Sequence, residues 1–107
     1  MPTYNKLVRD KIPQVIEATG KKYKSEILND QDYIKYLKEK SYEELDEYCA
    51  AQSNENAVEE LADLLEIIHA LAIYHGSSIE EVEKVREEKA EKRGGFLEKI
   101  FLVEVED

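Results

Sequence analysis

Residues 61–74 are the most apolar stretch of the chain, and this stretch limits the folds that the sequence can adopt. Its apolar side chains are interrupted by only three polar residues, Asp63, Glu66 and His69. We expect it to belong to a helix that runs to His75, with Gly76 as its C-terminal stop. A helix that is apolar almost all round must be covered on several sides, which one domain of 107 residues can hardly do alone. The stretch therefore predicts a homo-oligomeric helix bundle, either a homodimer or a homotetramer.

Two pairs of carboxylates lie close to the turn that precedes this helix. Glu44 and Glu47 are three residues apart, as are Glu60 and Asp63, so each pair shares one face of its helix. The turn between the two helices is short, and we expect them to pack as antiparallel neighbours that bring the pairs together. Four hard oxygen ligands around a small volume are the ligand chemistry of Mg²⁺, with Mn²⁺ as a substitute. The usual partner of a protein-bound Mg²⁺ is a substrate phosphate.

The alternative interpretation of these carboxylates is a solvated helix face. The chain has 25 acidic residues, so this spacing arises easily by chance. Glu44, however, lies on the apolar stripe of its own helix, where a carboxylate is costly unless it is paired or bound to metal. Glu60 and Asp63 open the most apolar helix of the chain. These placements favour a metal site.

The remaining local signals predict a mainly α fold with a small β element. Pro13 opens a short N-terminal helix that ends at Thr19 and Gly20. Three long helices are expected to follow, and the first runs from a cap at Asn29 and Asp30 to about Gln52. The second follows a turn at residues 53–56, has Asn56 and Glu59 in a capping arrangement, and runs to His75. The third runs from a cap at Ser77, Ser78 and Glu81 to Gly94 and Gly95. Weak alternation predicts strands at residues 23–28 and 100–106, paired as a two-stranded flap that needs the helices as support.

Composition and charge exclude several classes of protein. The length predicts a single domain over residues 1–107. The formal net charge of −10 should repel nucleic acid and anionic membranes, and the longest apolar run is too short to span a bilayer. One cysteine, Cys49, rules out an intramolecular disulfide, and no signal peptide is visible. We therefore expect a cytoplasmic protein that binds neither nucleic acid nor membrane.

The chain resembles a known family, the MazG-like all-α nucleoside triphosphate pyrophosphohydrolases. This family includes phosphoribosyl-ATP pyrophosphohydrolases. The family pattern is E-x-x-E, a spacer and E-x-x-D, which Glu44, Glu47, Glu60 and Asp63 match in type, order and spacing. Residues 4–13, YNKLVRDKIP, and residues 92–96, KRGGF, are similar to one subgroup of this family. The matching segments span nearly the whole chain, although the chain is short for the family. The resemblance therefore implies one MazG-like domain.

The resemblance implies an enzyme that hydrolyses nucleoside triphosphates between the α and β phosphates, giving a monophosphate and pyrophosphate. The four carboxylates would be both the metal ligands and the catalytic residues. Elementary chemistry agrees, because carboxylate-bound Mg²⁺ can neutralise a polyphosphate and polarise a water for in-line attack. The role would be the removal of non-standard or excess nucleotides.

Basic residues at three places are candidates for contacts with the phosphates. Lys89, Lys92 and Arg93 lie beside Gly94 and Gly95 at the end of the last helix, although cations are also common at helix C-termini. The other candidates are Arg9 and Lys11 in the N-terminal segment and Lys40 one turn before Glu44. The alternatives for these are surface charges and, for Lys40, a simple i,i+4 ion pair.

Three alternative functions remain open from the sequence. Phosphoribosyl-ATP hydrolysis in histidine synthesis would use the same metal site. A nucleotide-binding regulator could keep the fold with little turnover, although the presence of all four ligands argues against it. An acidic helical oligomerisation module would make the convergence of the carboxylates accidental.

Overall fold

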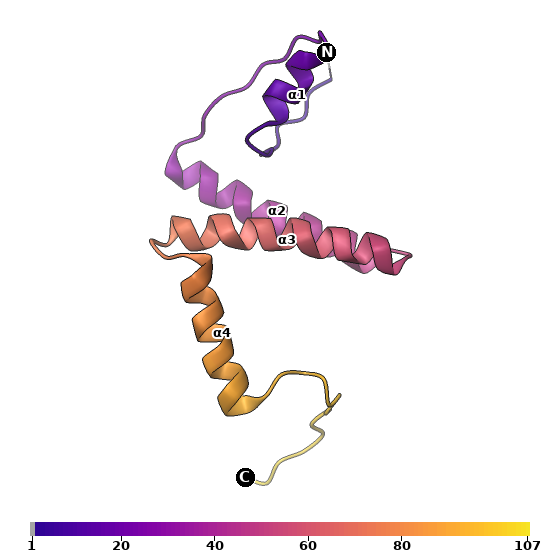
Figure 1. Cartoon of the computed structure of the whole chain (residues 1–107), viewed down its shortest axis with the longest axis vertical. Coiled ribbons are helices and arrows are strands. Elements are labelled where there is room, and N and C mark those ends of the chain that lie inside the picture. The colour runs from indigo at the N-terminus through magenta and orange to yellow at the C-terminus, as the bar shows by residue number, and fades with distance from the viewer. Residues whose placement is uncertain (1) are drawn as a thin grey trace.

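The computed structural model describes residues 2–107, which contain four helices (Figure 1). The first is a short helix, α1 (Ile12–Ala18), with a proline in its first turn. Three longer helices follow: α2 (Asp30–Ala50), α3 (Asn54–Tyr74) and α4 (Ile79–Arg93). The mainly α fold and the order of the helices agree with the sequence prediction. No described helix combines the length and apolar character that a membrane crossing requires.

Side-chain caps fix where the three long helices begin. The side chains of Asn29, Ser53 and Ser78 each accept a hydrogen bond from the backbone N–H three residues later, which satisfies a donor that the first turn leaves free. The predicted caps at Asn29 and Ser78 are confirmed. The predicted arrangement of Asn56 with Glu59 is wrong, because Ser53 caps α3 and the helix already begins at Asn54. The segment expected as a turn is thus mostly the first turn of α3.

The α2 and α3 helices form an antiparallel hairpin that carries most of the tertiary packing (Figure 1). The connection between them is only residues 51–53, so the end of α2 lies beside the start of α3. At the other end of the hairpin, α3 is followed by Gly76, whose positive φ of 73° is accessible to glycine without steric cost. The α4 helix then diverges from the hairpin instead of packing along it (Figure 1).

The core of one chain is small. Among the described residues, three apolar side chains are buried, those of Leu37, Ile67 and Ala72. The radius of gyration is 18.4 Å, against about 13 Å for a compact domain of this length. Leu61 and Leu65 on the apolar helix α3 remain about half exposed. One chain therefore leaves much of its apolar surface in contact with water.

The predicted two-stranded flap is not formed. Residues 21–29 and 100–107 are extended but belong to no strand in the described part of the chain. The connection between α1 and α2 lies on one side of the α2–α3 hairpin, and the C-terminal segment lies beyond α4 on the other side (Figure 1). The two segments are too far apart to pair within this chain, which corrects the β element of the predicted fold.

Candidate metal centre

The α2–α3 hairpin brings together the carboxylates of its two helices. Glu44 and Glu47 lie in the last two turns of α2, while Glu60 and Asp63 follow the first turn of α3. Carboxylate oxygens of Glu44, Glu60 and Asp63 all lie within 4.8 Å of one another. A spacing of this size is short enough for one ion to touch all three groups.

A second cluster shares Glu44 with the first. Oxygens of Glu43, Glu44 and Glu47 also lie within 4.8 Å of one another. Glu44 therefore connects the two clusters, and Glu47 lies on the exposed side. Glu43 was not singled out from the sequence, because a residue next to Glu44 points to a different side of the helix. The signal in the sequence that could have identified Glu43 is its position one helical turn after Lys40.

Two oxygens in the first cluster are buried without a hydrogen-bond partner. They are Glu44 Oε2 and Glu60 Oε2. Glu44 is only 7% exposed, and it is the only buried charged residue among those described. A buried acceptor without a donor costs a substantial part of its hydration energy. The missing partner must therefore be a proton, a water or a cation.

The pKa values show that these groups oppose one another's ionisation. The pKa of Glu44 is raised from 4.5 to about 7, first by burial and then by the side chain of Glu60 and the charges of Glu47 and Asp63. The pKa of Glu60 is also raised, again first by burial and then by the side chain of Glu47. A bound divalent cation would reverse this, because it stabilises the charged form of every ligand.

Three cationic side chains border the carboxylates. Arg9 Nη2 donates to Asp63 Oδ1 at 2.7 Å, which ties the segment before α1 to α3. Lys40 Nζ lies 3.8 Å from Glu44 Oε1 and 3.9 Å from Glu43 Oε2. Lys6 Nζ, which the sequence pattern did not single out, donates to Glu43 at 3.4 Å. Lys6 and Lys40 both line a small cavity of about 60 Å³ between the N-terminal segment and α2.

The other predicted phosphate contacts are not brought to this site within one chain. Lys11 is exposed at the start of α1. Lys89, Lys92 and Arg93 are exposed near the end of α4, and that end points away from the hairpin (Figure 1). None of these four residues forms an ion pair with another described residue.

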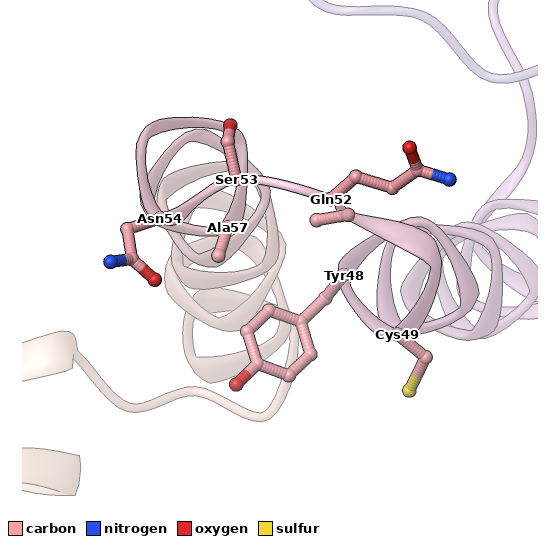
Figure 2. A pocket seen from close by; sticks show the side chains of 7 residues that line it. Tyr48, Cys49, Gln52, Ser53, Asn54 and Ala57 are labelled. Carbon is pink, nitrogen blue, oxygen red and sulfur yellow. The ribbon is translucent and has the colours of Figure 1, made fainter.

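An open depression of about 530 Å³ lies at the tip of the hairpin, where α2 ends and α3 begins (Figure 2). Tyr48 lines it, one helical turn after Glu44, and Ala57 lines it from one turn before Glu60 and Leu61. The Tyr48 ring points into the space beside α3, whereas Cys49 points away from that helix (Figure 2). No carboxylate of the two clusters lines the depression, which offers one flat aromatic surface.

No protein-family model, curated protein sequence or solved structure matches this chain. The structure itself shows a helical hairpin with an acidic centre. The donor set of this centre is the one expected for a hard divalent cation.

Proposed function

We propose that this protein is a Mg²⁺-dependent nucleoside triphosphate pyrophosphohydrolase of the MazG-like type, with Mn²⁺ as a substitute. The observation that carries the proposal is the pair of buried, unpartnered oxygens on Glu44 and Glu60, beside the carboxylate of Asp63. An acidic cluster on a solvated surface has no such oxygens, because water satisfies them. The donor set contains only carboxylate oxygens, which suits Mg²⁺ and gives no reason to expect a softer metal.

In this proposal Glu44, Glu60 and Asp63 hold the metal, and Glu47 completes the set from the exposed side. Bound Mg²⁺ would neutralise the charge of the polyphosphate and polarise a water for attack at the α phosphorus. Glu43 and Glu47 share a cluster with Glu44, and one of these two carboxylates would accept the proton of such a water. Hydrolysis between the α and β phosphates would then release pyrophosphate.

The neighbouring cations would bind the phosphates. A triphosphate carries nearly four negative charges, and the protein carries −10, so entry of the substrate needs local positive charge. Arg9 and Lys40 are already at the carboxylates, and Arg9 has the planar fork that suits phosphate oxygens. When the metal neutralises Asp63, Arg9 becomes free to turn to the substrate. The ring of Tyr48 in the depression at the hairpin tip would offer a flat surface for the base.

We further propose that the enzyme works as a homo-oligomer in the cytoplasm. A core of three buried apolar side chains is small for a stable domain, and a second copy would cover the exposed face of α3. The same assembly would give Lys89, Lys92 and Arg93 a route to the carboxylates of a neighbouring chain. The single, exposed thiol of Cys49 suits a reducing compartment.

The decisive experiment is a panel of nucleoside triphosphates incubated with Mg²⁺, with pyrophosphate and orthophosphate release measured separately. We expect pyrophosphate only. Asp63→Asn and Glu47→Gln keep the shape of each side chain and should each lower turnover by a hundredfold or more, with unchanged circular dichroism. The matched control is Asp46→Asn, which alters an exposed carboxylate of α2 outside both clusters. Orthophosphate release, or wild-type turnover in the Asp63 variant, would reject the proposal.

The same panel separates the alternatives. Phosphoribosyl-ATP tested beside the common nucleotides distinguishes a biosynthetic enzyme from one that removes unwanted nucleotides. Binding without turnover would identify a regulator. Absence of both metal binding and nucleotide binding would leave the helical oligomerisation module.

A further inference from the structure

The C-terminal segment, residues 100–106, carries the most exposed apolar side chains on any continuous stretch of the chain. Ile100, Phe101, Leu102, Val103 and Val105 are each between 72% and 89% exposed. Removing such apolar side chains from water is favourable, so the segment as a whole has a strong tendency to be covered. It follows a turn at residues 96–99 and extends away from α4 (Figure 1).

A second extended segment, residues 22–28, runs between α1 and the start of α2, on the side of the hairpin opposite to the C-terminal segment (Figure 1). Its Ile27 is 99% exposed, and Tyr23 is partly exposed. The segment carries Lys22 and Lys24 against one acidic residue, Glu26, and Lys21 precedes it, whereas the C-terminal segment carries Glu104 and Glu106 and is followed by Asp107. The two segments therefore have opposite charge, and each has apolar side chains with nothing against them.

We propose that residues 100–106 of one copy pair as an antiparallel strand with residues 22–28 of a second copy. The two segments lie on opposite sides of the α2–α3 hairpin within one chain (Figure 1), and a partner chain removes that separation. A twofold arrangement would form the contact twice, because each copy offers both segments. This inference stands independently of the proposed hydrolysis.

The side chains favour one register. When Lys24 lies directly across from Glu104, Lys22 also lies directly across from Glu106. Opposite charges directly across an antiparallel pair are favourable, and apolar pairs likewise. The same register sets Ile27 against Phe101 and Tyr23 against Val105 on the other face. A slip of one residue sets Lys24 against Val103 and Tyr23 against Glu104, so it loses both charge pairs and keeps a single apolar pair, Ile27 against Ile100.

The helices supply the support that an isolated two-stranded ribbon lacks. Two strands alone are marginally stable in water. The face of the ribbon with Tyr23, Ile27 and Phe101 is apolar, and α3 has exposed Val58, Leu61 and Leu65 at helical spacing. We expect the ribbon to lie against this face of the assembly.

Disulfide trapping tests the pairing and its register together. The variant Ser25→Cys, Val103→Cys is made in a Cys49→Ser background, so that the two introduced thiols are the only ones present. In the proposed register these positions are directly opposite, with Cβ atoms roughly 4.5–5.5 Å apart. Mild oxidation should give a covalent dimer of twice the 12.4 kDa chain mass on a denaturing gel without reductant. The matched control, Ser25→Cys with Leu102→Cys, moves one thiol to the other face and should cross-link at least tenfold more slowly.

The result also separates the competing arrangements. A disulfide formed at monomer mass would show that the segments pair within one chain and would overturn the proposal. Equal cross-linking of the control would overturn the register, and no cross-linking would overturn the pairing altogether.

Charge reversal gives an independent measurement in the full chain. Lys24→Glu and Glu104→Lys should each raise the dissociation constant of the oligomer about tenfold or more in sedimentation, and the double variant should restore it. Single variants that associate like the wild type would overturn the pairing. A double variant that associates no more tightly than the single variants would also overturn the pairing.

Discussion

Arg9 Nη2 lies 2.7 Å from Asp63 Oδ1, across 54 positions of the sequence. This contact joins the segment before α1 to the carboxylate centre on α3. The two side chains are 56% and 40% exposed, so the pair contributes at most about 1 kcal/mol to stability. Its position is more informative than its strength, because Arg9 supplies one positive charge where the carboxylates need neutralisation.

The first prediction is that divalent metal stabilises the protein. Saturating Mg²⁺ or Mn²⁺ relieves the repulsion among Glu44, Glu60 and Asp63, and a ligand at a hundred times its Kd adds about 2.7 kcal/mol. Thermal unfolding with and without the metal should show a rise of several degrees in Tm. Glu44→Gln should abolish most of this rise, while Asp46→Asn should keep it. An unchanged wild-type Tm would show that the site does not bind metal.

The second prediction concerns pH in the absence of metal. The pKa of Glu44 in the folded protein, about 7, is above its ordinary 4.5. Folding therefore favours the protonated form, so this contribution to stability is fully present below pH 4.5 and is lost as pH rises through 7. Burial dominates the shift, and the raised pKa of Glu60 acts in the same direction.

This can be measured by urea unfolding at pH 5 and pH 8 in the presence of a chelator. The free energy of unfolding of Glu44→Gln, relative to that of the wild type, should be higher at pH 8 than at pH 5 by up to about 3 kcal/mol. Glu66→Gln, which alters an exposed carboxylate of α3, should follow the wild type at both values. Saturating metal should remove the pH dependence that distinguishes the wild type from Glu44→Gln, because ligands bind metal in their charged form. A wild type that keeps the same stability relative to Glu44→Gln at both pH values would contradict the assignment.

The third prediction separates the two roles of Arg9. Arg9→Ala removes a competitor for Asp63, so metal affinity should stay equal or increase by a few fold. It also removes a phosphate ligand, so kcat/KM for triphosphates should fall about tenfold, or 1.4 kcal/mol in transition-state binding. Arg9→Lys should recover only part of this, since lysine lacks the planar fork. Unchanged kcat/KM with reduced stability would show that Arg9 only anchors the N-terminal segment.

The α2–α3 hairpin was predictable because its signals are local. Asn29 and the spacing of Glu44, Glu47, Glu60 and Asp63 act within one or two helical turns, and a three-residue connection leaves the helices little choice but to lie antiparallel. The start of α3 was misplaced because Ser53 and Asn56 are both good caps. Ser53 prevails since it allows one more helical turn while still satisfying the N–H of Asn56.

The direction of α4 was not predictable in the same way, because it depends on the backbone turn at Gly76. The strands expected at residues 23–28 and 100–106 are not formed within one chain. Periodicity indicated which of their side chains share a face, but it carries no information about whether an opposite strand lies within reach. Arg9 was a candidate from sequence, yet its contact with Asp63 follows from the path of the chain around α2.

The last prediction tests whether the cations of α4 act on a neighbouring chain. Lys89, Lys92 and Arg93 lie on an end of α4 that points away from the hairpin of the same chain (Figure 1). If they contact the polyphosphate, they must do so at the carboxylates of a second copy. Arg93→Ala and Asp63→Asn should therefore each be nearly inactive alone, with little change in Tm. After unfolding and refolding together in equal amounts, half of the dimers contain one chain of each kind.

Each mixed dimer would have one site that lacks both groups and one site that is whole, because the intact carboxylates of one chain meet the intact Arg93 of the other. The mixture should thus recover roughly a quarter of wild-type activity, and mixing the folded variants without exchange should recover none. The control mixture of Asp63→Asn with Glu44→Gln should stay inactive, since both changes lie in the same half of the site. If Arg93→Ala alone keeps full kcat/KM, Arg93 is only a helix-terminal residue. If the first mixture stays inactive after exchange, its phosphate contact is made within one chain.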